Sequence, residues 1–225
     1  MLNNKMVKTL LTFIGYFLYS MLATTIINAF HISNEILVYF ICDMVFLVGI
    51  VFAYKDNLKE DFINLKTKIK NDKFYLLKTI LLWVVIIITF NFIMGALTDL
   101  IFKTPELDAN TNAVIALKNQ SLFYTIFKSM IFATFAEELL FRESVHDVVS
   151  NKWFFIIISA VIYTAMNFVF SETGAEISIL NILVYFLPAL IFSFAYTKND
   201  NNILVLMLIK LAYNIIPLIL MVTGV

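Results

Sequence analysis

The chain has 225 residues, of which 61% are hydrophobic and 14% are charged. This composition excludes an ordinary soluble domain, in which about 25% of residues are charged, and it indicates a polytopic membrane protein whose first partner is the lipid bilayer. Lys plus Arg and Asp plus Glu both number 16. The chain therefore lacks the net basic charge that nucleic-acid binding requires, and we expect no nucleic-acid partner.

Seven apolar segments are long enough to cross about 30 Å of hydrocarbon at about 1.5 Å per residue. They predict an all-α fold, a polytopic membrane helical bundle of about seven spans. No internal repeat or Pro/Gly/Ser-rich linker divides the chain, so we expect a single membrane domain over residues 1–225. In chain order the predicted spans are 7–30, 35–54, 76–97, 122–142, 153–170, 177–196 and 203–222.

Lysines gather in the loop between the second and third predicted spans. The positive-inside rule therefore predicts that this loop and the N-terminus lie in the cytoplasm. Within the loop, residues 56–75 interleave charged and apolar side chains at helical spacing, which predicts an amphipathic helix on the inner leaflet. Abundant Lys, Asn, Ile and Phe beside a single Arg favour a bacterial source, so we expect a multi-pass protein of the bacterial cytoplasmic membrane.

Two polar residues interrupt the early spans. Asp43 lies in the second predicted span and Asn91 in the third. They could line the pathway of a small transporter, or they could form hydrogen bonds that hold helices together. The sequence leaves both interpretations open.

The fourth predicted span carries the most informative feature of the sequence, Glu137, Glu138 and Arg142, inside an otherwise apolar stretch. Each ionised residue near the centre of a spanning helix costs roughly 2.5 to 3.5 kcal/mol, so these charges must pair and must face protein or water. Glu138 and Arg142 are four residues apart and share one helix face, whereas Glu137 lies about 100° round the helix. Adjacent carboxylates in a dry site repel each other, which makes one of them a candidate general base. Alternatively, the three charges neutralise one another at a helix end.

The fifth and seventh predicted spans bring polar residues to a similar depth. The turn near residues 151–152 places Asn167 about as far along the returning span as Glu138 lies before the turn. The turn near residues 201–202 does the same for Lys210 and Asn214, which share a helix face. We therefore expect a polar chamber formed by the fourth, fifth and seventh spans.

The polar residues of the fourth, fifth and seventh predicted spans, which begin with Glu137-Glu138-x-x-x-Arg142, resemble three motifs of the CPBP (Abi) family. This is a family of CAAX-type and bacteriocin-processing intramembrane proteases, and the resemblance covers about residues 123–220. The family's usual Phe-x-x-x-His and His-x-x-x-Asn motifs are here Tyr163-x-x-x-Asn167 and Lys210-x-x-x-Asn214. Both family histidines are thus replaced. The resemblance implies a glutamate that activates water, with neighbouring polar side chains that bind metal or stabilise the oxyanion. The candidate catalytic residues are Glu137, Glu138, Arg142, Asn167, Lys210 and Asn214.

The replaced histidines change the expected chemistry. No cofactor is expected, and zinc is disfavoured because zinc sites depend on His or Cys ligands. The only histidines are His31 and His146, for which we expect ordinary interfacial roles. Lys210 close to the glutamates would form a buried ion pair that quenches the base.

The favoured hypothesis is therefore an intramembrane protease fold with weak or no proteolysis. Such a protein would act in bacteriocin or peptide immunity, or as a membrane partner of another protein. The alternative is an active glutamate-dependent endopeptidase of the CAAX type that processes a membrane-associated peptide.

Overall fold

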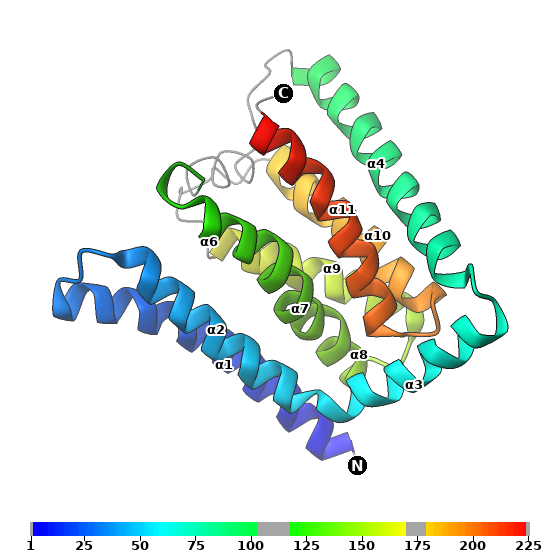
Figure 1. Cartoon of the computed structure of the whole chain (residues 1–225), viewed down its shortest axis with the longest axis horizontal. Coiled ribbons are helices and arrows are strands. Elements are labelled where there is room, and N and C mark those ends of the chain that lie inside the picture. Colours follow the sequence, from blue (N-terminus) through cyan, green and yellow to red (C-terminus); the bar gives the residue numbers. More distant parts are fainter. Residues whose placement is uncertain (1, 103–117, 170–178, 224–225) are drawn as a thin grey trace.

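A computed structural model describes residues 2–102, 118–169 and 179–223, and every element in these ranges is helical (Figure 1). The helices are α1 (Leu2–Phe30), α2 (Glu35–Ala53), α3 (Lys55–Asn71), α4 (Tyr75–Phe102), α6 (Leu122–Ile126), the π-helical η1 (Phe127–Phe132), α7 (Ala133–Glu138), the π-helical η2 (Leu139–Glu143), α8 (Ser144–Val148), α9 (Lys152–Val169), α10 (Ile179–Lys198) and α11 (Ile203–Thr223). The predicted all-α fold is confirmed.

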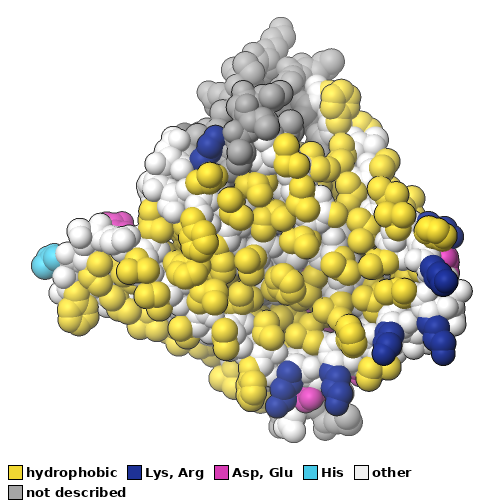
Figure 2. All heavy atoms as spheres, viewed as in Figure 1, with side chains coloured by type: hydrophobic (Ala, Val, Ile, Leu, Met, Phe, Trp, Pro, Cys, Tyr) yellow, Lys and Arg dark blue, Asp and Glu magenta, His cyan; other side chains and the backbone are white. Residues whose placement is uncertain are grey.

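A helix, or a continuous run of helical segments, lies at each of the seven predicted spans. Within the described residues, three helices are long and apolar enough to cross a membrane: Asn4–Phe30, Glu35–Ala53 and Tyr75–Met94. The apolar helices Lys152–Phe168 and Ile203–Ile219 are shorter. The start of the sixth predicted span, residues 177–178, lies outside the described residues. Figure 2 shows hydrophobic side chains over most of the visible face, as expected for a surface in contact with lipid.

The run α6–η1–α7–η2–α8 lies in the middle of the bundle, between the α1–α2 hairpin and helices α9, α10 and α11 (Figure 1). From Phe132 to Val145 no side chain of this run is exposed, because helices pack on several sides of it, whereas Phe123 and Ile131 nearer its start are exposed. Its buried apolar residues Phe132, Leu139, Leu140 and Phe141 share one core cluster with Phe155 of α9 and Leu206 of α11. The predicted fourth span is therefore the core element of the fold.

Helix α3 crosses one end of the bundle and joins α2 to α4 (Figure 1). It covers most of the predicted amphipathic segment 56–75 but ends at Asn71, and Tyr75 already begins α4. Leu65 is buried and most of the lysines are exposed, although Phe62 is exposed as well. Asp61 ties α3 to the start of α11: its Oδ2 accepts a hydrogen bond of 2.7 Å from the backbone N–H of Ile203. The side chain of Asn202 donates in return to the carbonyl of Asp61.

The polar residues of the second and third spans hold helices together. Asp43, buried on α2, accepts hydrogen bonds from the Tyr124 hydroxyl at 2.8 Å and from the Lys128 ammonium at 2.9 Å. Asn91 on α4 donates through Nδ2 to the Tyr213 hydroxyl of α11 at 2.6 Å. These contacts support the helix-packing interpretation rather than a transport pathway.

Candidate active site

Glu137 and Glu138 end α7, which lies between the two π-helical segments η1 and η2. A π-helical turn contains an extra residue, so it rotates the following side chains and leaves backbone carbonyls free for other donors. In both segments a backbone carbonyl accepts a hydrogen bond from a neighbouring helix. Asn214 of α11 donates through Nδ2 to the Ser129 carbonyl in η1 at 2.8 Å, and Ser159 of α9 donates to the Phe141 carbonyl in η2 at 2.7 Å. The two neighbouring helices thus fix the backbone on either side of the glutamates.

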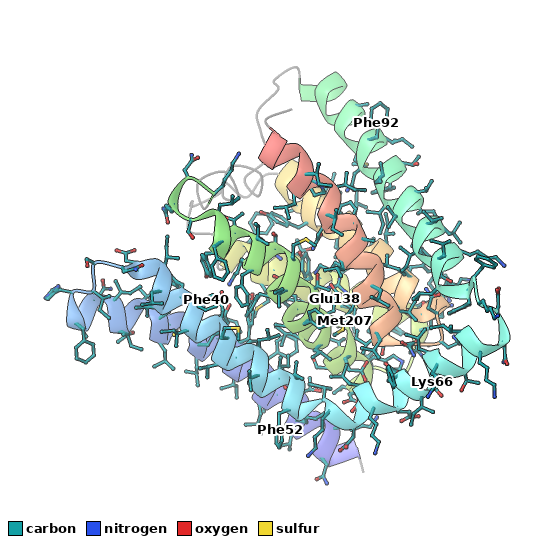
Figure 3. All side chains as sticks on the ribbon, viewed as in Figure 1. Phe40, Phe52, Lys66, Phe92, Glu138 and Met207 are labelled. Carbon is teal, nitrogen blue, oxygen red and sulfur yellow. The ribbon has the colours of Figure 1, made fainter. Side chains whose placement is uncertain are left out.

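Lys210 joins the two carboxylates. Its Nζ lies 2.6 Å from Glu138 Oε1 and 3.2 Å from Glu137 Oε2. The lysine projects from α11, so the ion pair also connects the central helix to the last one. Figure 3 shows Glu138 in the interior of the bundle, where α7 and α11 are in contact. The carboxylate that lacks a partner on its own helix, Glu137, thus finds one on another.

Arg142 occupies the opposite side of Glu138. Its Nε lies 3.4 Å from Glu138 Oε2, as the four-residue spacing predicted, and its NH2 donates to the Ala189 carbonyl of α10 at 3.4 Å. Both side chains are fully buried. Within the described residues, Glu138 Oε2 and the Nε and NH1 of Arg142 have no hydrogen-bond partner of good geometry. Such groups are costly in a dry interior, and they mark a site that is less completely satisfied than an ordinary helix contact.

Aromatic rings enclose the two cations. The Tyr163 ring centroid lies 5.0 Å from Arg142 Cζ and 5.8 Å from Lys210 Nζ. Phe192 of α10 lies 5.8 Å from Lys210 Nζ. The faces of aromatic rings attract cations, and their bulk excludes water. Ser129 and Phe192 were missed by sequence reasoning, because neither belongs to a motif and each reaches the site only through packing.

The six predicted residues take different positions. Four meet in one ion-pair cluster: Glu137, Glu138, Arg142 and Lys210. Asn214, on α11, does not join the ion pairs but holds the Ser129 carbonyl of η1. Asn167 donates through Nδ2 to the Tyr163 carbonyl one turn earlier in α9, at 2.8 Å, and no hydrogen bond joins it to either glutamate in the described structure. Its predicted role in catalysis stays a prediction.

The donor set does not fit a metal ion. A cation at the glutamates would have to displace the ammonium of Lys210, and neither histidine is close enough to help. His31 lies exposed in the turn after α1, and His146 packs against Phe155 and Tyr196 at 5.3 and 5.4 Å between ring centroids. Among residues 2–102, 118–169 and 179–223, no three His, Cys, Asp or Glu side chains are grouped as metal ligands. We therefore derive no step through a metal.

Residues 119–216 match the family model described as type II CAAX prenyl endopeptidase Rce1-like. The resemblance to the CPBP family is thereby confirmed for this segment, which contains all six candidate residues. No curated protein and no solved structure matches the chain.

Proposed function

We propose that this chain is a membrane protein with a CAAX-protease fold that binds a membrane-associated peptide or a partner protein and has weak or no proteolytic activity. The observation that carries the proposal is the position of Lys210, whose ammonium pairs with both motif glutamates. A general base must be free to accept a proton from water. An ammonium within hydrogen-bond distance stabilises the ionised carboxylate and so weakens it as a base.

The surroundings of the ion pair support the same proposal. The side chains of Glu138, Arg142 and Lys210 are all buried, and rings of Tyr163 and Phe192 lie over the cations. A water molecule would have to displace part of this cluster before it could be activated. Removal of a single positioned donor typically costs about 2.7 to 4 kcal/mol of transition-state stabilisation, and the resemblance implies that two family histidines are replaced in this chain. On the basis of the family resemblance, we further propose that the protein acts in peptide or bacteriocin immunity.

The alternative, an active glutamate-dependent endopeptidase, has one observation in its favour. The side chain of Glu137 is 19% exposed, whereas that of Glu138 is fully buried, and Glu137 forms the longer contact with Lys210. Glu137 is therefore the carboxylate that water can reach. In this scheme it would activate the water, while Lys210, Asn167 and Asn214 would contact the oxyanion or the substrate.

The test is a cleavage assay read by mass spectrometry, with purified protein in lipid nanodiscs and a panel of bacteriocin-leader and prenylated peptides. We expect the native chain to leave the peptides intact and the variant Asn167→His/Lys210→His to gain cleavage. Cleavage by the native chain that disappears in Glu137→Gln or Glu138→Gln would instead establish the active enzyme. Asp43→Asn is the matched control, because it changes a buried carboxylate outside the site. The same peptides carrying a fluorescent label are titrated with the native chain in parallel. Their binding tests the proposed binding function independently of cleavage.

A further inference from the structure

Helix α3 sorts its charges to different sides. At about 100° per residue, four of its lysines fall within a sector of about 60°. This sector lies between the buried face of the helix and the side that carries Asp56 and Glu60. The four are Lys55, Lys59, Lys66 and Lys70, and all are exposed. Lys68 lies on the opposite side of the helix and is already paired, 2.6 Å from Asp200. The charge of α3 is thus concentrated on one flank.

Two large apolar side chains border this sector. Phe62 is 60% exposed and Ile63 is 55% exposed, one on each edge of the lysine row. We refer to the set Lys55, Lys59, Phe62, Ile63, Lys66 and Lys70 as the lysine flank. Basic side chains interleaved with exposed apolar ones are typical of helices that lie in a membrane interface, where the apolar groups enter the lipid and the ammonium groups meet phosphates.

The lysines of the flank stay unpaired in the part of the chain that the structure describes. None of the described residues is in ion-pair distance of Lys55, Lys59, Lys66 or Lys70, and the pairs Lys55/Lys59 and Lys66/Lys70 repel each other at a spacing of four residues. Asp56 and Glu60 are exposed on α3 beside the flank. The other acidic residues nearby are bound inside the protein: Asp61 accepts from the Ile203 N–H, Glu143 accepts from Asn57 and Tyr196, and Asp147 pairs with Lys5 and Lys8. An anion from outside the chain would relieve the repulsion.

The position of α3 selects the source of that anion. The helix connects α2 and α4, both of which contain candidate membrane spans, so it lies at the level where the spans end. Figure 2 shows Lys and Arg side chains gathered along this edge of the molecule, and Figure 3 shows Lys66 on α3 at the same end. This is the level of the phospholipid headgroups.

We propose that the lysine flank of α3 is a binding site for anionic phospholipids, with the four ammonium groups on lipid phosphates and with Phe62 and Ile63 among the upper acyl chains. Lysines near an anionic membrane surface each strengthen binding, about fivefold per residue. The apolar pair distinguishes this partner from a soluble anion, which would gain nothing from Phe62 or Ile63. The site is separate from the glutamate cluster and does not depend on the proposed function.

The test uses the single native cysteine. In a Cys42→Ser background, Ile63→Cys is labelled with a polarity-sensitive fluorophore, and the full chain is placed in nanodiscs of phosphatidylcholine with increasing phosphatidylglycerol. We expect a blue shift of the emission that grows with the anionic fraction and weakens with added salt. In Lys59→Gln/Lys66→Gln/Lys70→Gln the preference for anionic lipid should fall by on the order of 100-fold.

Three controls make the result decisive. Lys73→Gln/Lys152→Gln/Lys198→Gln removes the same charge from other exposed positions and should retain the response. Lys59→Glu/Lys66→Glu/Lys70→Glu should respond to a cationic lipid instead, which also shows that a variant with an altered flank still folds. Equal emission with and without phosphatidylglycerol, or the same shift produced by inorganic phosphate or by an acidic peptide in phosphatidylcholine nanodiscs, would overturn the proposal.

Discussion

Two ion-pair regions inside this bundle have similar residue types, but they differ in how many of their polar atoms have hydrogen-bond partners. At the first, Asp43 meets one lysine and one tyrosine hydroxyl, and both carboxylate oxygens accept hydrogen bonds. At the second, Glu137 and Glu138 share Lys210, while buried atoms of Glu138 and Arg142 have no good hydrogen-bond partner in the described structure. The first region joins α2 to the central helical run and leaves no oxygen of Asp43 unpaired. The second holds more charges in a smaller space and leaves some of their buried atoms without a partner in the described structure.

Lys210→Met should have the largest effect on stability. The change leaves two adjacent carboxylates with Arg142 as their only cation, and loss of one partner of a buried ion pair costs about 3 to 5 kcal/mol. Unfolding of the protein in mixed micelles by increasing SDS, monitored by circular dichroism, gives the free energy of unfolding. Stability close to that of the native chain would mean that the glutamates do not depend on Lys210.

The two glutamates should differ when each is changed to glutamine. Glu138→Gln leaves the buried Arg142 without an anion, so we expect a loss of about 2 to 4 kcal/mol. Glu137→Gln should cost less than about 1 kcal/mol, because this side chain is partly exposed and Lys210 keeps Glu138. The same SDS unfolding measurement compares the pair. Equal losses would contradict the assignment of Glu138 as the more deeply held carboxylate.

Lys128→Met tests the satisfied region and should cost about 1 to 3 kcal/mol. Asp43 is buried and loses its cation, but Tyr124 continues to donate to it, and the site has one carboxylate rather than two. A Lys128→Met loss as large as that of Lys210→Met, measured in the same micelles, would remove the distinction between the two regions.

The smallest expected effect concerns the contact of α3 with α11. Burial is the main cause that raises the pKa of Asp61 from 3.8 to about 6, against the opposing hydrogen bond from the Ile203 N–H. Because the folded value lies above the unfolded one, the native state binds more protons, and the contribution of Asp61 to stability falls as pH rises from about 4 through about 6. Asparagine carries no charge and can still accept the hydrogen bond.

Asp61→Asn should therefore stabilise the protein at pH 7.5 relative to the native chain, with a smaller difference at pH 5. Thermal unfolding in nanodiscs at the two pH values measures this change. Asp56→Asn, an exposed carboxylate on the same helix, is the matched control and should change little at either pH. A difference for Asp61→Asn that is larger at pH 5 would have the wrong sign.

Sequence patterns predicted what depends on local spacing. The length and hydropathy of the spans predicted the helices, and the spacing of four residues predicted the contact of Glu138 with Arg142. Lys210 was placed near the glutamates by its depth in the last span, and the ion pair followed from charge alone. These inferences work because a spanning helix has a fixed rise and the membrane fixes its level.

The rest depends on packing that spacing does not encode. Nothing in residues 127–143 distinguishes a π-helical turn from an α-helical one, although the two π-helical segments fix the backbone on both sides of the glutamates. The partner of Asp43 lies on a helix 85 residues away in the sequence, at Lys128. The hydrogen bonds that Asn57 and Tyr196 donate to Glu143 likewise join three distant elements.

The most direct test of the central claim is the cleavage assay on the native chain and on Asn167→His/Lys210→His, in nanodiscs and with the same peptide panel. We predict intact peptides with the native chain and new products with the double variant, since removing the lysine frees the glutamates and the histidines supply the donors that the family resemblance implies. Products formed by the native chain and abolished by Glu137→Gln would contradict it, and would show that a glutamate paired with lysine still acts as the base.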